Sequence, residues 1–268
     1  MIKHKCLFFI LIVFLAISTT LFAQDKSAIN RILKSKEIRV GTTGKQPPFT
    51  VKAKDGKLMG YEIELARILA DAMKVKLSFI EKPFAELLPA LEKGEIDAIM
   101  SGMTITPERN LRVAFAGPYI ISGKSVLAKA KRISELDEMN EINRPVIKVV
   151  VLEGTTSQSF VENFAPQVKI VTVSDYESGV DMILNDQADV MVADYPICVL
   201  SILRHPESGL ATREEPLTIE PIGIALPPND FLFHNMIRNY LNAIGMVGVL
   251  NDLEKKWFDD GTWLIRLP

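Results

Sequence analysis

The chain has 268 residues, which is more than a typical single domain of roughly 150 residues, so we expect two small lobes. Its charged fraction of 24% and hydrophobic fraction of 48% are ordinary for a globular protein. A formal net charge of −2 gives no basic surface that would attract DNA, RNA or anionic lipid. The composition therefore argues against a nucleic-acid-binding protein.

Residues 1–23 have the pattern of a secretory signal peptide. Lys3 and Lys5 form a basic start, an apolar run follows from Leu7 to Ile17, and Ala23 offers a small residue for cleavage before Gln24. This apolar run is too short for a membrane-spanning helix of about 20 residues. We expect a secreted protein, periplasmic or extracellular, from which the signal peptide is cleaved.

Strand and helix patterns alternate through the first part of the mature chain. The expected elements are a helix over Ser27–Lys36, a strand over Ile38–Gly41, a helix over Tyr61–Met73, a strand over Lys76–Ile80, a helix over Phe84–Leu91 and a strand over Ile96–Met100. Asp55-Gly56 predicts a hairpin turn between the first of these strands and the helix that follows it.

The same alternation returns in the middle of the chain. We expect strands over Val146–Leu152, Val168–Val173 and Val190–Ala193, helices over Gln158–Phe164, Tyr176–Leu184 and Asp194–Leu203, and a long C-terminal helix that contains Phe233 to Ile244. Two rounds of alternation predict an α/β protein with two lobes, each built on a mainly parallel or mixed sheet.

The stretch Ser101–Arg109 carries the clearest polar signal. It leaves an apolar strand and enters a helix whose N-cap is Thr106 and whose first residue is Pro107. Hydroxyls of Ser101 and Thr104, together with the Arg109 guanidinium, can converge there on a carboxylate. The alternative is a capped surface helix with Arg109 in solvent.

Three further features are candidates for ligand contact. Thr155 and Thr156 lie between a strand and a helix, where free N–H groups favour an anion, although an ordinary N-cap explains them equally well. Asp194 occupies a similar junction and could also be a cap. Phe49 and Phe84 could each stack on a ligand or belong to the core.

Catalytic and metal-binding patterns are missing from the sequence. We find no Ser/His/Asp or Cys/His set, no glycine-rich phosphate fingerprint, and no cluster of potential metal ligands around the isolated His205 and His234. Cys198, the single cysteine after Gln24, lies in an apolar stretch. These observations favour a binding protein without cofactor or metal over an enzyme.

As a set, the motifs resemble those of the family 3 extracytoplasmic solute-binding proteins, the amino-acid receptors of bacterial uptake transporters. The motifs that carry the resemblance are Arg39-Val40-Gly41-Thr42-Thr43 with Pro48-Phe49, Asp55-Gly56 with Gly60-Tyr61, Asp97 to Arg109, Gly154-Thr155-Thr156, Ala188-Asp189 with Asp194, Gly223-Ile224-Ala225 and Lys256-Trp257-Phe258. The resemblance implies a two-lobed periplasmic-binding-protein type II fold with a hinged ligand cleft. It places residues 28–124 and 226–268 in lobe 1 and residues 125–225 in lobe 2.

The resemblance also implies a function and a set of site residues. The protein would be a monomer that captures an amino acid between its lobes and delivers it to the permease of an ABC transporter. Residues that match Ser101, Met103, Thr104, Arg109, Thr156 and Asp194 hold the amino and carboxylate groups of the ligand in this family. The full set that we expect to bind the ligand is Thr43, Gln46, Phe49, Phe84, Ser101, Gly102, Met103, Thr104, Arg109, Glu153, Thr155, Thr156 and Asp194.

Two departures from the family bear on specificity. Many members have an aromatic residue in place of Gln46, and receptors for basic amino acids often have an acid near Thr43. Thr43, Lys45, Gln46, Phe84 and Glu153 are the candidates to meet the ligand's side chain. Because there is no acid near Thr43, we expect a polar uncharged amino acid rather than lysine or arginine. The alternative is that Glu153 supplies the missing acid.

An alternative function comes from the enzyme class. The chain is also similar to the cyclohexadienyl dehydratases, exported enzymes on the same scaffold that act on prephenate or arogenate. That likeness rests on Gly41-Thr42-Thr43-Gly44, on Leu203-Arg204-His205-Pro206 and on the tail around Trp257 and Trp263. A dehydratase needs an acid that protonates a leaving hydroxyl.

Overall fold

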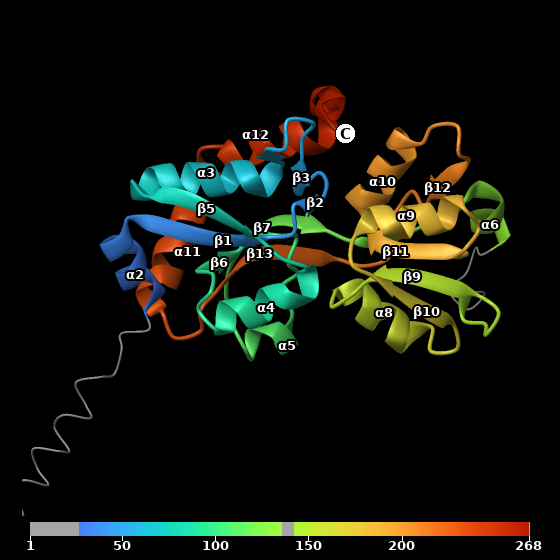
Figure 1. The fold of residues 1–268 in the computed structure, drawn as a ribbon, viewed down its shortest axis with the longest axis horizontal. Helices are drawn as coiled ribbons and strands as arrows, with labels where there is room; N and C mark the ends of the chain where they lie inside the picture. The colour runs from blue at the N-terminus through green and yellow to red at the C-terminus, as the bar shows by residue number, and fades with distance from the viewer. Residues whose placement is uncertain (1–26, 136–141, 268) are drawn as a thin grey trace, which may run out of the picture.

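The protein folds into two α/β lobes. A computed structural model describes residues 27–135 and 142–267, so the predicted signal peptide lies outside the described residues. Two five-stranded sheets and one three-stranded sheet are present, and Figure 1 shows the two large sheets side by side with helices on both faces of each. None of the helices in the described part of the chain has the length and hydropathy that a membrane span requires.

The first large sheet has the strand order β5-β1-β6-β13-β7. Its strands are β1 (Glu37–Thr42), β5 (Lys76–Glu81), β6 (Ala98–Ile99), β7 (Ala114–Ser122) and β13 (Glu220–Leu226). β1 pairs in parallel with β5 and β6, whereas β13 runs antiparallel to β6 and β7. The helical segments of this lobe are α2 (Ala28–Ser35), α3 (Tyr61–Met73), α4 (Phe84–Glu92), α5 (Pro107–Asn110), α11 (Phe231–Met246), α12 (Val249–Glu254), a π-helix (Lys255–Asp259) and a 3-10 helix (Gly261–Arg266).

The second large sheet has the strand order β10-β9-β11-β8-β12. Its strands are β8 (Lys124–Lys129), β9 (Lys148–Leu152), β10 (Lys169–Val173), β11 (Val190–Asp194) and β12 (Leu210–Thr212). Its helices are α6 (Ala130–Glu135), α8 (Thr156–Phe164), α9 (Tyr176–Leu184) and α10 (Tyr195–Arg204). Strands β9 and β11 are buried apolar runs, as expected of strands covered on both faces, because α8 lies on one side and α9 and α10 on the other (Figure 1).

A small sheet joins the first lobe near the boundary with the second. It consists of β2 (Lys45–Gln46), β3 (Thr50–Lys52) and β4 (Leu58–Met59), paired antiparallel. The turn predicted at Asp55-Gly56 connects β3 to β4, and Gly56 has a positive φ of 77° there. This sheet brings Gln46 towards α9 of the second lobe (Figure 1).

The chain crosses between the large sheets twice, and the second crossing corrects our prediction. We placed residues 220–225 in lobe 2, but β13 pairs with β7 along its length and therefore belongs to the first sheet. Lys124 likewise begins a strand of the second sheet rather than ending lobe 1. The two crossings pass so close together that a Cβ on Gly123 would lie 2.2 Å from the Thr218 carbonyl oxygen.

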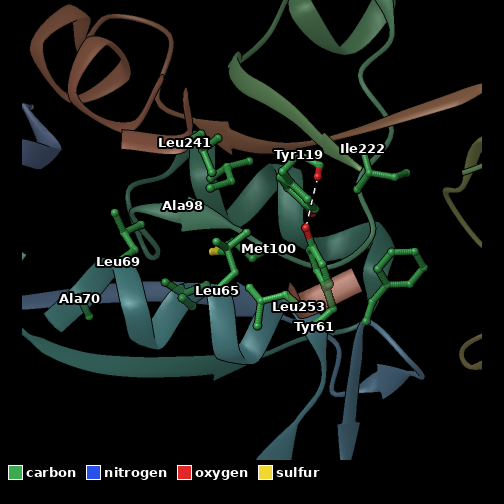
Figure 2. Packing of buried hydrophobic residues seen from close by; sticks show 14 of the residues in the cluster. Tyr61, Leu65, Leu69, Ala70, Ala98, Met100, Tyr119, Ile222, Leu241 and Leu253 are labelled. Carbon is green, nitrogen blue, oxygen red and sulfur yellow. Dashed lines mark hydrogen bonds between the residues drawn. The ribbon is translucent and has the colours of Figure 1, made fainter. Parts of the chain in front are cut away.

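The core of the first lobe packs α3 and α11 against the central strands. Figure 2 shows Leu65 of α3 near Met100 and Tyr61 of α3 pointing to Tyr119, and Leu241 of α11 belongs to the same buried cluster. The Tyr61 hydroxyl donates a hydrogen bond to the Tyr119 carbonyl oxygen at 3.2 Å, so its polar end is satisfied within the core. This packing gives β6 a rigid support, and the Ser101–Arg109 stretch leaves the end of β6.

Asp97, just before β6, ties three elements of this lobe together. Its carboxylate accepts hydrogen bonds from the Arg39 backbone N–H at 2.7 Å, from the Arg39 guanidinium at 2.8 Å and from Arg31 Nε at 2.8 Å. The Asp97 side chain is only 2% exposed, while the two arginines reach solvent. A buried carboxylate with several charged donors is among the stronger polar interactions in a fold.

We predict that Asp97→Asn lowers the free energy of unfolding by about 2 to 3 kcal/mol, because the amide cannot accept all of these charge-assisted bonds. Urea denaturation measures the change. The matched control is Glu81→Gln, since Glu81 pairs with Lys52 at 2.9 Å but both side chains are largely exposed. That variant should stay within about 0.5 kcal/mol of the wild type. Equal effects of the two substitutions would contradict the role given to Asp97.

Candidate ligand-binding site between the lobes

A cavity lies between the two lobes at the ends of β6, β9 and β11. The cavity is small, and its lining is more polar than apolar. The lining residues are Gln46, Phe84, Gly102, Thr104 and Arg109 from the first lobe and Thr155, Thr156, Ser157, Tyr176 and Asp194 from the second.

The structure brings eight of the residues that we expected to bind the ligand to this cavity and leaves five away from its lining. Phe49 is fully buried in the core, with its ring centroid 5.3 Å from that of Phe258, so the expectation that it could stack on a ligand is wrong. Met103 is also fully buried. Glu153 is exposed to solvent. Thr43 and Ser101 lie behind the lining and support it.

Arg109 reaches the cavity from the first turn of α5. Thr106 caps this helix by accepting the Arg109 backbone N–H at 3.2 Å, and Pro107 is its first residue, as the sequence predicts. The guanidinium donates to the Thr104 carbonyl oxygen at 2.9 Å and to the Gly154 carbonyl oxygen of the second lobe at 3.2 Å. These bonds fix the orientation of the guanidinium and leave further N–H donors for a ligand.

Arg109 is a buried cation without a partner anion among the described residues. It is 8% exposed, and its guanidinium carbon lies 5.6 Å from the centre of the Phe84 ring. No carboxylate in the described ranges lies within 4.0 Å of it. Burial lowers the pKa of Arg109, although the charges of Glu220 and Asp194 act in the opposite direction. The alternative of a solvated surface arginine is therefore excluded.

Gln46 is anchored on the first-lobe side by two hydroxyls. Its amide oxygen accepts hydrogen bonds from Ser101 at 2.6 Å and from Thr43 at 2.9 Å. Ser101 in turn accepts the Thr43 backbone N–H at 3.1 Å. Ser101 and Thr43 thus contribute to the site indirectly, because they occupy the Gln46 amide oxygen and so direct the amide nitrogen towards the cavity and the Tyr176 hydroxyl.

A buried carboxylate that our sequence analysis did not identify holds the loop after β6. Both oxygens of Glu62 accept the Gly102 N–H, at 2.9 and 2.8 Å, and the Tyr119 hydroxyl donates to the same carboxylate. Burial raises the pKa of Glu62 to about 7. In the sequence, Glu62 looks like an ordinary acidic residue in the first turn of a helix, and only the fold reveals its partners.

In the second lobe, Thr155 and Thr156 divide two roles. Thr155 is the N-cap of α8, and its hydroxyl accepts the Gln158 N–H at 3.4 Å. Thr156 is the first residue of the helix and does not cap it, and both threonines line the cavity. The Thr156 hydroxyl lies 3.4 Å from that of Thr104 and so meets the first lobe. The capping alternative therefore holds for Thr155 only.

Thr156 rests on a buried ion pair that carried no sequence signal. Lys124, 1% exposed, forms a salt bridge with Glu220 and donates to the Thr156 hydroxyl oxygen at 2.8 Å. The Thr156 hydroxyl donates to Glu220 Oε2 at 3.2 Å, and Thr218 donates to the other oxygen at 3.0 Å. The contacts with Lys124, Glu220 and Thr104 therefore fix the Thr156 hydroxyl at the wall of the cavity.

Asp194 is the buried anion of the cavity. It stands at the N-cap position of α10, but its side chain makes no capping hydrogen bond, so the capping alternative does not explain it. Asp194 is 5% exposed and no cation in the described part of the chain lies within salt-bridge distance. Burial raises the pKa of its carboxyl to about 6, while the positive charges of Lys124 and Arg109 lower it and Glu220 raises it further.

The cavity therefore presents a guanidinium from one lobe and a carboxylate from the other. Burying a charge without a partner costs several kcal/mol, so both groups favour a ligand that supplies their counter-charges. Ser157 and Tyr176 complete the lining, and neither was expected from the sequence. Within residues 27–135 and 142–267, no three His, Cys, Asp or Glu side chains gather as metal ligands would.

Curated relatives match nearly the whole length of this chain. It is 27% identical to the ABC transporter arginine-binding protein 1 of Escherichia coli, over 84% of this chain and 91% of that protein. It is 28% identical to the histidine-binding periplasmic protein of E. coli, over 84% and 88%. It is 26% identical to the cyclohexadienyl dehydratase of Pseudomonas aeruginosa, over 90% of each protein.

Solved structures show the same fold. An ancestral amino acid-binding protein, described as a precursor of cyclohexadienyl dehydratase, matches with a TM-score of 0.81 and 33% identity, over 87% of this chain and 100% of that one. A binding component of an ABC transporter from Wolinella succinogenes, complexed with lysine, also gives 0.81 and 33%, over 86% and 99%. The two-lobed type II periplasmic-binding-protein fold expected from the sequence is therefore confirmed.

The family assignment rests on most of the described chain. Residues 38–260 match the model of the bacterial extracellular solute-binding proteins, family 3. That range includes every residue that lines the cavity between the lobes. The chain therefore belongs to family 3 of the bacterial extracellular solute-binding proteins.

Proposed function

We propose that this protein captures a free amino acid with a polar uncharged side chain between its lobes and delivers it to the permease of an ABC transporter. The observation that carries the proposal is the pair of buried, oppositely charged groups, Arg109 and Asp194, which line one cavity from opposite lobes. A free amino acid has a carboxylate for Arg109 and an ammonium for Asp194. Arg109 can bind the carboxylate through two parallel hydrogen bonds.

The two charged groups of the cavity support this orientation of the ligand. Asp194 is buried in the lining and has no cation within salt-bridge distance among the described residues, so its carboxylate suits an ammonium. On the other side, the free N–H donors of Arg109 suit the carboxylate. Because these groups belong to different lobes, a ligand completes its contacts only when the cleft is closed, and closure is driven by the ligand's higher affinity for the closed state.

The balance of buried charge supports an uncharged side chain. Lys124 is paired with Glu220, and the remaining two charges of the site, Arg109 and Asp194, are matched by a zwitterion. A cationic side chain would need a further acid in the lining. Glu153, the acid that the sequence offered as an alternative for that role, is exposed and does not line the cavity.

The relatives support the transport role and the location. One is named an arginine-binding protein of an ABC transporter, and one solved structure is a binding component of an ABC transporter. We propose the same place for this protein, in the periplasm after cleavage of residues 1–23, as a monomer without a cofactor. Because a cyclohexadienyl dehydratase is among the relatives, the enzymatic alternative also needs an experimental test.

A thermal-shift screen of the exported protein against the free amino acids and prephenate tests the proposed function. Ligand at 100 times its dissociation constant stabilises the folded state by about 2.7 kcal/mol, which is readily measured. We expect stabilisation by one or more polar uncharged amino acids and none by arginine, lysine or prephenate. Stabilisation by arginine would contradict the proposed specificity. Conversion of prephenate to phenylpyruvate by the pure protein would instead establish the enzymatic alternative.

The pKa of Asp194 predicts how binding depends on pH. Its value of about 6 in the ligand-free protein means that the carboxylate is protonated below that pH and cannot pair with an ammonium. An amino acid remains a zwitterion between pH 5 and 7. The dissociation constant should therefore be steady near pH 7 and above, and should rise below pH 6, approaching about tenfold per unit.

Isothermal titration calorimetry from pH 5 to 7.5 measures this dependence. Asp194→Asn is the control. Burial also raises the pKa of Glu62, to about 7, and this variant keeps Glu62, so it separates the effect of Asp194 from that of Glu62. The variant should bind weakly at every pH, with the step near pH 6 removed. A wild-type affinity that does not change between pH 5 and 7 would show that Asp194 does not bind the ligand's ammonium.

A further inference from the structure

We infer that Tyr176 sets an upper limit on the length of the ligand's side chain, which narrows the substrate class to amino acids with short polar side chains. The inference rests on the proposed function, because it takes the amino and carboxylate groups to be held by Asp194 and Arg109. Tyr176 is the first residue of α9 in the second lobe and is 4% exposed. No motif in the sequence pointed to it.

Tyr176 stands between two cavities. One is the cavity that Arg109 and Asp194 line, and the other is lined mainly by residues of α9 and α10. Tyr176 lines both of them. The second cavity is further lined by Lys45, Pro47, Glu177, Val180, Ile197, Leu200, Ser201 and Arg204. The tyrosine side chain is therefore a partition, and the second cavity is the space that a longer ligand side chain would otherwise enter.

Contacts from both lobes hold the partition in place. The Gln46 side chain of the first lobe forms a hydrogen bond with the Tyr176 hydroxyl. Gln46 is itself fixed by Ser101 and Thr43, whose hydroxyls occupy its amide oxygen. On the second-lobe side, the ring packs in a buried apolar cluster with Val180 and Ile197.

The residue before Tyr176 adds a second link across the cleft. Asp175 caps α9 by accepting the Ser178 N–H at 2.9 Å, which fixes the start of the helix. Its other carboxylate oxygen pairs with Lys45 of β2 at 3.0 Å. The Tyr176 ring thus cannot turn away without the loss of its cluster packing or of its bond to Gln46. A side chain too long for the first cavity would have to displace the ring or keep the lobes apart.

The lining left to the ligand's side chain is small and polar. With Arg109 and Asp194 engaged, Phe84, Gln46 and Ser157 are among the lining residues that remain for the side chain. Gln46 can donate from its amide nitrogen, and a serine hydroxyl can donate or accept. Hydroxyl or short amide side chains, as in serine, threonine and asparagine, match this lining, whereas glutamine and arginine reach past the partition.

Calorimetric titration of serine, threonine, asparagine, glutamine and arginine tests the inference. The wild type should bind at least one of the three short amino acids about 100-fold or more tightly than glutamine or arginine, since one methylene in a tight pocket already changes discrimination by roughly 10- to 200-fold. In Tyr176→Ala, which joins the two cavities, that ratio should fall by about tenfold or more. Tyr176→Phe keeps the ring and should keep the wild-type order of preference, whatever its absolute affinity.

Two controls distinguish the loss of the Tyr176 ring from unfolding of the second lobe. Phe164→Ala removes an exposed ring from the end of α8, 66% exposed, and should leave the ratio unchanged. Thermal melting shows whether Tyr176→Ala is folded, and Tyr176→Leu provides a milder truncation with a smaller change in the same direction.

The outcomes distinguish this inference from the proposed function. Wild-type protein that binds glutamine or arginine as tightly as serine or threonine would overturn the role of Tyr176 while leaving amino-acid capture in place. A ratio that is unchanged in folded Tyr176→Ala and Tyr176→Leu would do the same. If no amino acid binds to the wild type at all, the proposed function itself fails.

Discussion

The structure depends on one electrostatic constraint, which is that Arg109 and Asp194 are buried in one cavity and have no counter-ion among the described residues. The cost of this arrangement is visible in Asp194, because burial raises its pKa to about 6. A zwitterion relieves both charges at once, and it does so only when the lobes come together. In the function that we propose, selectivity for free amino acids and the coupling of binding to closure have the same physical origin.

The rest of the site keeps these two charges in place without neutralising them. In the first lobe, the Glu62 carboxylate accepts the Gly102 N–H, which fixes the loop between β6 and Arg109. In the second lobe, the Lys124–Glu220 pair holds the Thr156 hydroxyl beside Asp194. Lys124 follows the first crossing between the sheets and Glu220 ends the second, so the same ion pair also joins the two connections between the lobes.

Local patterns predicted much of this structure. Tyr61–Met73 and Tyr176–Leu184 were predicted as helices with the observed bounds, and Arg109, Thr156 and Asp194 were expected at the site and line its cavity.

Features that depend on contacts between residues far apart in the sequence could not be predicted from local patterns. β7 and β13 contain glycine and proline that obscure a strand pattern, and their pairing joins residues about 100 positions apart in sequence, such as Ala116 and Ile224. Phe49 was misassigned because an aromatic residue has the same sequence signature in a core and in a pocket, while Tyr176 and Lys124 reach the site only through tertiary packing.

The most direct test of the central claim is small-angle X-ray scattering of the wild type, Arg109→Ala and Asp194→Asn, each with and without the amino acid that binds most tightly to the wild type. The account predicts that ligand lowers the radius of gyration of the wild type. Neither variant should become compact at the same ligand concentration, because removal of one charge leaves the other without a partner and weakens binding by roughly two to three decades or more. Full compaction of the wild type without ligand, or normal compaction of either variant with ligand, would contradict it.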